Sequence, residues 1–175
     1  MVAPDLRRLD PPPGRRVDAR LQAVFRFDDR FDLVIVHRDA EAQDPQRRRE
    51  EVANGVAAVR EDVPALPVVP IRMTEAWLLV DEDAIRRVAG RPTGTEPLGL
   101  PAAGDVEDVP DAKHVLRRAL ETASGAKGRR LRSFKRDFDG QRRRLLEGLD
   151  HGGPVSQLSA WQALESSVEA ALAEL

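Results

Sequence analysis

The feature that most constrains the fold is an apolar run that ends abruptly in charged residues. Residues 33–36 read Leu-Val-Ile-Val, and His37-Arg38-Asp39-Ala40-Glu41 follows at once. The β-branched residues favour a strand, and helical stretches on either side favour a parallel strand in an α/β sheet. Ligands bind beyond the carboxyl ends of strands in such sheets. Asp39 and Glu41 are therefore candidate metal ligands, although a solvated loop carrying two acids would give the same pattern.

A second apolar run, at residues 66–71, reads Leu-Pro-Val-Val-Pro-Ile. Its prolines lack the amide hydrogen that a paired strand donates, which favours an edge or bulged strand. The segment Thr74-Glu75-Ala76-Trp77-Leu78-Leu79 comes next, and Thr74 can cap a helix that starts there. The acidic residues 81–83 predict a break in that helix.

The acidic residues after these two apolar runs form one candidate site. If the strands are neighbours, Glu75 lies at the same sheet edge as Asp39 and Glu41. Converging carboxylates repel one another unless a cation bridges them, so the pattern predicts bound Mg²⁺ or Mn²⁺. Alternatively, Glu75 binds no metal, and its negative charge stabilises the N-terminal end of the helix that begins there.

The order of these segments resembles a known family. The pattern consists of residues 32–41, residues 67–71, the element Glu75-Ala76-Trp77-Leu78-Leu79, and Pro110-Asp111-Ala112-Lys113 before a helix. It looks like the TOPRIM-like bacterial family catalogued as domain of unknown function 4276. The resemblance covers roughly residues 30–172, and the Glu-Ala-Trp-Leu-Leu element is its most specific part.

The resemblance implies both a fold and a function. The fold would be α/β, with a short, mostly parallel sheet of three or four strands, helices on both faces and a helical C-terminal third. TOPRIM relatives include topoisomerase and primase catalytic domains and the nuclease domains of overcoming-lysogenization-defect proteins. The resemblance therefore implies a Mg²⁺-dependent nuclease or nucleotidyl-transfer domain in a mobile-element or phage-defence context, with an ATPase as partner. Asp39, Glu41 and Glu75 would then be the catalytic residues and the metal ligands.

One part of the family pattern has no counterpart in the sequence. TOPRIM domains open with a strand ending in a Glu that serves as general acid and base, whereas this chain begins Met1-Val2-Ala3-Pro4-Asp5. A misassigned start, a trimmed chain and a degenerate family member are all consistent with this departure. In the last case the protein would be a catalytically inactive binding or regulatory module that engages nucleic acid or an ATPase.

A basic segment is the second functional signal. Residues 127–144 contain nine Lys and Arg against two Asp, a net charge of +7 in a chain of net charge −2. Such a segment can follow a phosphate backbone, although apolar residues at helical spacing make the charges equally consistent with the solvated side of a helix. The candidate nucleic-acid or phosphate contacts are Arg38, Lys113, Lys135, Arg142, Arg143 and Arg144.

Length and composition set the remaining expectations. The 175 residues suit a single domain with a core at about residues 1–90, a loop at about 90–110 and a helical region at about 111–175. A capping box of Ser159 and Gln162 predicts the start of the terminal helix. With no cysteine and no run of about twenty apolar residues, the sequence predicts a cytoplasmic protein without a membrane span.

Overall fold

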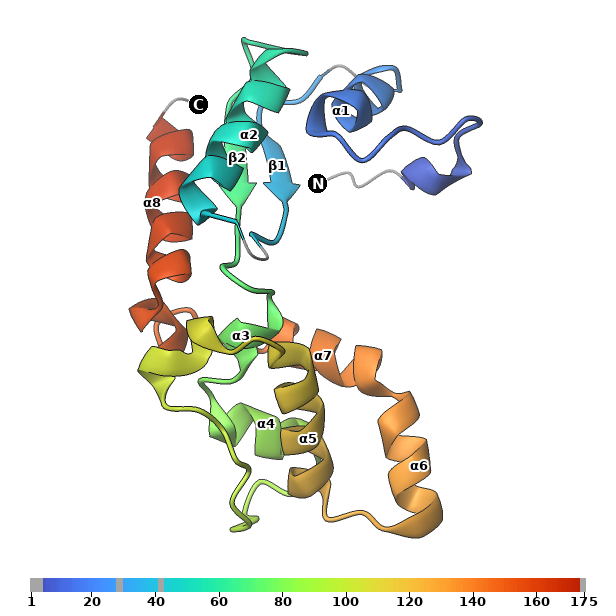
Figure 1. The fold of residues 1–175 in the computed structure, drawn as a ribbon, viewed down its shortest axis with the longest axis vertical. Helices are drawn as coiled ribbons and strands as arrows, with labels where there is room; N and C mark the ends of the chain where they lie inside the picture. Colours follow the sequence, from blue (N-terminus) through green and yellow to red (C-terminus); the bar gives the residue numbers. More distant parts are fainter. Residues whose placement is uncertain (1–4, 28–29, 41–42, 174–175) are drawn as a thin grey trace. The chain divides into compact units, whose positions relative to one another are not determined.

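The computed structural model describes residues 5–27, 30–40 and 43–173 (Figure 1). The chain forms two compact units, the first of residues 1–69 with 163–175 and the second of residues 70–162. The boundary at Val69 and Pro70 lies inside the region that we expected to be the core of a single domain. No helix within the described ranges is long and apolar enough to cross a membrane.

The first unit is built on a pair of strands. Its elements are the 3₁₀ helix η1 (Leu6–Arg8), α1 (Val17–Phe25), β1 (Val34–His37), α2 (Pro45–Ala57), β2 (Ala65–Val68) and, from Ala163 onward, α8 (Ser159–Ala173). The strands β1 and β2 are parallel and pair in the register Val34 with Ala65 through His37 with Val68. The predicted parallel α/β arrangement is therefore confirmed, although the described residues contain two strands where three or four were expected.

The second strand begins earlier than its apolar run suggests. β2 covers Ala65–Val68, and Pro67 lies opposite Val36 in the register. A proline is compatible with this position because β2 is an edge strand of a two-stranded sheet. Pro70, the second proline of the run, lies beyond the end of the strand.

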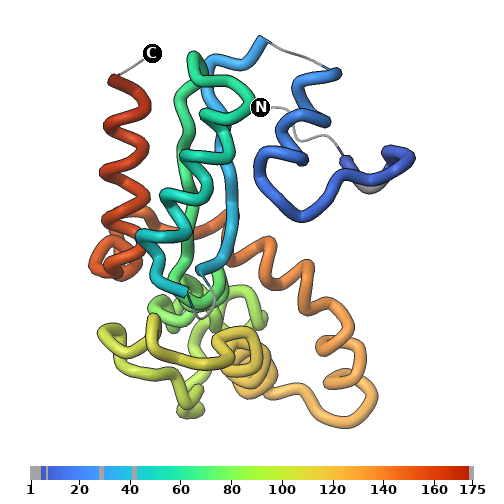
Figure 2. Tube along the Cα trace, turned by 45° about the horizontal axis from the view of Figure 1, so that its top comes forward, coloured from blue at the N-terminus to red at the C-terminus, as the bar shows by residue number. Residues whose placement is uncertain are grey.

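Helices α1 and α2 build the core of the first unit. Val17 and Leu21 of α1 pack with Val52 and Val56 of α2, and the partly buried side chains against them include Val34 and Val36. Figures 1 and 2 show α2 running alongside the two strands. On the other face of β1, Ile35 is 51% exposed, so the expected helical cover on both faces is incomplete at this residue.

A glycine sets the distance between these two helices. A Cβ atom at Gly55 of α2 would lie 2.7 Å from the Cβ of Val17, which is too close for two carbon atoms. The absence of a side chain therefore lets α1 pack against α2 at this point.

The second unit is helical. Its elements are α3 (Glu75–Leu78), α4 (Glu82–Val88), the 3₁₀ helix η2 (Ala103–Asp108), α5 (Ala112–Ser124), α6 (Gly128–Arg136), α7 (Phe138–Glu147), the 3₁₀ helix η3 (Pro154–Gln157) and the start of α8. The predicted break near residues 81–83 separates α3 from α4, where the Asp81 carboxylate accepts a hydrogen bond from the amide of Ala84. The segment expected to be a loop contains η2.

The core of the second unit is formed mainly by α3, α4 and α5. Leu78, Ile85 and Leu116 are almost completely buried. Trp77 and Trp161 meet edge to face, with ring centroids 5.2 Å apart. Asp111 caps α5 by accepting a hydrogen bond from the amide of His114. This helical core is the platform on which α6 and α7 are placed.

Candidate functional site

Asp39 lies directly beyond the carboxyl end of β1, as predicted. Its Oδ1 is 3.8 Å from Nε2 of His37, and its side chain is 36% exposed. Asp39 also lines a cavity of about 530 Å³ in the first unit. Arg38, one of the predicted phosphate contacts, lines the same cavity and forms an ion pair of 2.9 Å with Glu51 of α2.

Glu75 begins α3 and is buried in the second unit. Its Oε1 is 2.9 Å from Nε of Arg142 on α7. An ionised carboxylate is stable at a buried position when a cation is paired with it. Arg142 therefore places a positive charge beside the buried carboxylate of Glu75.

The structure describes two of the three predicted metal ligands. Asp39 belongs to the first unit, Glu75 belongs to the second, and Glu41 lies outside the described residues. In residues 5–27, 30–40 and 43–173, no group of three His, Cys, Asp or Glu side chains could hold a metal ion. The metal site of Asp39, Glu41 and Glu75 stays a prediction.

The basic segment forms two helices, not the single helix that its periodicity predicts. Helix α6 ends at Arg136, and α7 begins at Phe138. The side-chain amide of the buried Gln141 donates a hydrogen bond of 2.8 Å to the carbonyl of Phe134, which also accepts one from the backbone amide of Asp137 at the end of α6. The break is thus stabilised from inside α7.

Helix α6 has two contrasting faces. Arg129, Arg132 and Arg136 follow one another at helical spacing on one side, while Leu131 and Phe134 lie on the opposite side and are partly buried. We call the three arginines the basic face of α6. None of the three forms an ion pair with any residue that the structure describes.

The other predicted contacts are mostly engaged with acidic or aromatic side chains. Lys135 lies 2.8 Å from Glu121, and Arg144 lies 2.9 Å from Asp137. The ammonium group of Lys113 is 6.0 Å from the centre of the Phe138 ring. Arg143 is exposed and has no acidic partner within the described part of the chain.

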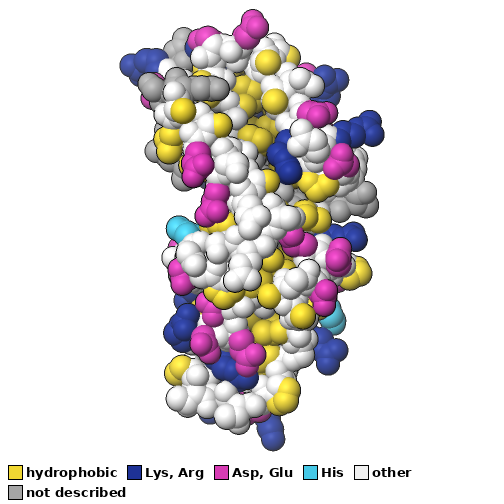
Figure 3. Space-filling model, turned by 90° about the vertical axis from the view of Figure 1, so that its left-hand side faces the viewer, with side chains coloured by type: hydrophobic (Ala, Val, Ile, Leu, Met, Phe, Trp, Pro, Cys, Tyr) yellow, Lys and Arg dark blue, Asp and Glu magenta, His cyan; other side chains and the backbone are white. Residues whose placement is uncertain are grey.

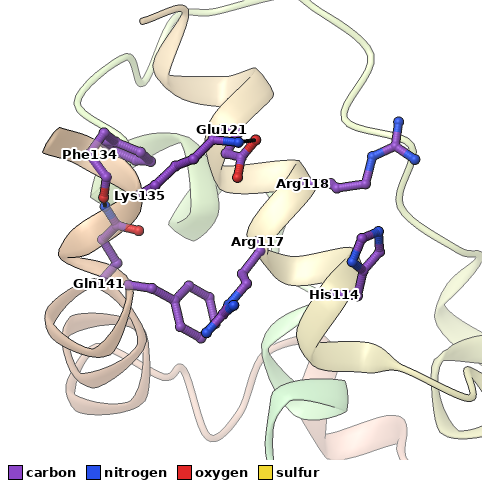
Figure 4. A pocket seen from close by; sticks show the side chains of 8 residues that line it. His114, Arg117, Arg118, Glu121, Phe134, Lys135 and Gln141 are labelled. Carbon is purple, nitrogen blue, oxygen red and sulfur yellow. Dashed lines mark hydrogen bonds and ion pairs between the residues drawn. The ribbon is translucent and has the colours of Figure 1, made fainter. Parts of the chain in front are cut away.

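A groove of about 590 Å³ runs between α5 and the α6–α7 pair (Figure 4). From α5 it is lined by His114, Arg117, Arg118 and Glu121, and from α6 and α7 by Phe134, Lys135, Phe138 and Gln141. The guanidinium of Arg117 lies 4.4 Å from the centre of the Phe138 ring. A cation at this distance over an aromatic face is favourable and fixes the side chain of Arg117.

Sequence reasoning missed Arg117 and Arg118. The signal was available, because His114, Arg117, Arg118 and Glu121 are separated by three, one and three residues, which places them on one exposed stripe of a helix. The two arginines lie outside the basic segment at residues 127–144.

The charge is distributed unevenly over the surface. Acidic and basic side chains are interspersed over the face that Figure 3 presents. The basic face of α6, by contrast, has three arginines in succession. A cluster of positive charges attracts polyanions more strongly than a surface on which positive and negative charges alternate.

The comparisons with known proteins add no relative. No family model matches the sequence, and no curated protein or solved structure is significantly similar to it. The resemblance to the TOPRIM-like family therefore stays a prediction.

Proposed function

We propose that this protein binds nucleic acid through α6 and the exposed arginine of α7. One observation carries the proposal. Six cations of the segment are exposed and form no ion pair within the described residues, namely Lys127, Arg129, Arg130, Arg132, Arg136 and Arg143. Cations without an acidic neighbour can release counterions from a phosphate backbone, which is the main source of affinity for nucleic acid.

The spacing of the basic face suits this partner. Arg129 and Arg136 are seven residues apart, which corresponds to about 10 Å along a helix axis. A single strand of duplex DNA presents a phosphate roughly every 3.4 Å of its axis. The basic face therefore spans about three phosphate intervals of one strand, while Leu131 and Phe134 on the opposite side are partly buried.

The test compares two pairs of arginines. Arg129→Gln with Arg132→Gln removes two charges from the basic face, and Arg47→Gln with Arg49→Gln removes two from α2 in the first unit. The affinity for a single-stranded and a duplex oligonucleotide is measured by fluorescence anisotropy over a range of salt concentrations. The α6 variant should flatten the logarithmic salt slope by about 1.4 to 1.8, and the α2 variant should leave it unchanged.

Two results would contradict the proposal. The first is an absence of binding to either oligonucleotide at low salt by the unmodified protein. The second is an equal loss of slope in both variants, which would mean that net charge, and not the α6 surface, determines the interaction.

A metal-dependent phosphodiesterase is the second candidate function. The observation that favours it is the position of Asp39, which lies beyond the carboxyl end of a parallel strand and lines a cavity. A bound Mg²⁺ would activate water and neutralise charge on a scissile phosphate, and proteins commonly hold this ion with one or two carboxylates. Asp39 supplies one of them, and Glu41 is the predicted second.

Thermal stability tests this candidate. Millimolar Mg²⁺ or Mn²⁺ should raise the melting temperature, because a ligand that binds only the folded state stabilises it. Asp39→Asn should remove that increase, whereas Asp32→Asn, a matched change before the start of β1, should retain it. An increase that persists in the Asp39 variant would place the metal elsewhere.

A further inference from the structure

The cavity of the first unit has chemical features that the proposed functions do not use. Its volume is about 530 Å³, within the range of about 300 to 1,000 Å³ that is usual for small-molecule sites. It lies between α1 and the end of β1, where ligands bind in α/β folds. One wall is apolar, with lining residues such as Val17, Leu21 and Val24.

The polar side of the cavity is dominated by arginine. Arg15 and Arg20 reach it from the α1 side, and Arg38 and Arg48 from the strand and from α2. Two carboxylates offset part of this charge. Asp39 lines the cavity, and Glu51 forms ion pairs with both Arg38 and Arg48. Four guanidinium groups against two carboxylates leave two positive charges, which matches a dianion.

Arg48 provides independent support for a ligand. The residue is only 5% exposed, and its guanidinium contacts Glu51 through Nη1. Its Nε is buried and has no hydrogen-bond partner among the described residues. A buried donor without an acceptor is unfavourable, and more so when it is charged. An anionic oxygen bound in the cavity would remove this cost.

From these observations we propose that the cavity binds a phosphate monoester whose organic group rests on the apolar wall. Arginine forks match the geometry of phosphate oxygens and can bind them in pairs. The ligand has two plausible sources with the same chemistry, a free mononucleotide or the 5′-phosphate end of a nucleic acid strand. The proposal is independent of α6, which belongs to the second unit.

Calorimetric titration tests the site with inorganic phosphate, adenosine 5′-monophosphate, and a short oligonucleotide with either a 5′-phosphate or a 5′-hydroxyl group. Arg20→Gln changes an exposed residue and should weaken binding of the monophosphate by about tenfold or more, the effect of losing a charged hydrogen bond. Arg48→Lys keeps the charge but loses the planar fork, and should weaken it as well. Arg47→Gln, the neighbouring exposed arginine on α2, is the matched control and should leave affinity unchanged.

The outcomes separate cleanly. Tighter binding of the 5′-phosphorylated than of the 5′-hydroxyl oligonucleotide assigns the site to strand ends, and equal affinity of the two oligonucleotides assigns it to free mononucleotides. The proposal is overturned if the unmodified protein binds neither phosphate nor the monophosphate, if Arg20→Gln has no effect, or if Arg47→Gln weakens binding equally. The variant with Arg129→Gln and Arg132→Gln should retain full affinity for the mononucleotide, which distinguishes this site from the α6 surface.

Discussion

The helices α6 and α7 each contain several arginines, but the environments of these arginines differ. In α6, Arg129, Arg132 and Arg136 are exposed and have no acidic neighbour within the described residues. In α7, Arg142 is paired with the buried Glu75, and Arg144 is paired with Asp137. An arginine that already neutralises a carboxylate releases few additional counterions on binding a phosphate.

The comparison shows why a net charge is an incomplete guide to binding. Counted from the sequence, residues 127–144 carry a net charge of +7. The structure divides that charge into a part that stabilises the fold and a part that is available to a partner. Only the second part is relevant to nucleic-acid affinity, and it is concentrated in α6.

The largest expected effect comes from breaking the buried pair. Glu75→Gln keeps the size of the side chain but removes the charge opposite Arg142, and should lower the free energy of unfolding by about 2 kcal/mol. Both tryptophans of the chain, Trp77 and Trp161, lie in the second unit, so their fluorescence during urea denaturation reports on this change.

The matched control for this measurement is Glu147→Gln. Glu147 is exposed at the end of α7, and its change should alter stability by no more than about 0.5 kcal/mol. If Glu75→Gln were as mild as the control, the ion pair would have no structural role, and Glu75 would again be free to act as a metal ligand.

The next effect concerns binding. Replacing Arg129, Arg132 and Arg136 together by Gln should reduce the logarithmic salt slope for nucleic acid by about two to three. The corresponding triple change of Arg142, Arg143 and Arg144 should reduce it by only about 0.7 to 0.9, because Arg143 alone has no acidic partner in the described chain. The slopes of both variants are measured by anisotropy over the same salt range. An equal reduction in the two variants would show that the ion-paired arginines of α7 still bind phosphates.

The elements that were predictable from sequence depend on local patterns. The apolar, β-branched run at Val34–His37 forms a strand because its alternate side chains Val34 and Val36 pack on the helices. The helix α5 follows from its apolar periodicity and from Asp111 at its cap. The parallel pairing of the two strands follows from the helical stretch between them.

The features that were missed depend on residues that are distant in the chain. The capping box of Ser159 and Gln162 does not form, because the carboxylate of Glu107 accepts the hydrogen bonds from the amides of Ser159 and Ala160. The side-chain amide of Gln162 instead donates to the carbonyl of Ser156. A motif can specify that a helix starts here, but it cannot identify which side chain will satisfy the free amides.

Glu75 illustrates the same limit for a candidate site. Its place after an apolar run fits a metal ligand, and its partner Arg142 is separated from it by most of the second unit. No local pattern links the two residues. The break between α6 and α7 is similar, because both halves have helical periodicity and the hydrogen bond from Gln141 becomes visible only in the structure.

The smallest expected effect uses the exposed pair of α7. Arg144 and Asp137 are 52% and 56% exposed, and pairs of this kind contribute less than about 1 kcal/mol to stability. Asp137→Asn should therefore change the free energy of unfolding by only a few tenths of a kcal/mol. The same change frees Arg144 for a phosphate, so the salt slope for nucleic acid should steepen by up to about 0.9. Asp139→Asn, which removes an exposed charge that has no ion pair within the described residues, is the control for the general loss of negative charge. A slope that steepens equally in both variants would indicate that Arg144 does not contact the strand even when its acidic partner is removed.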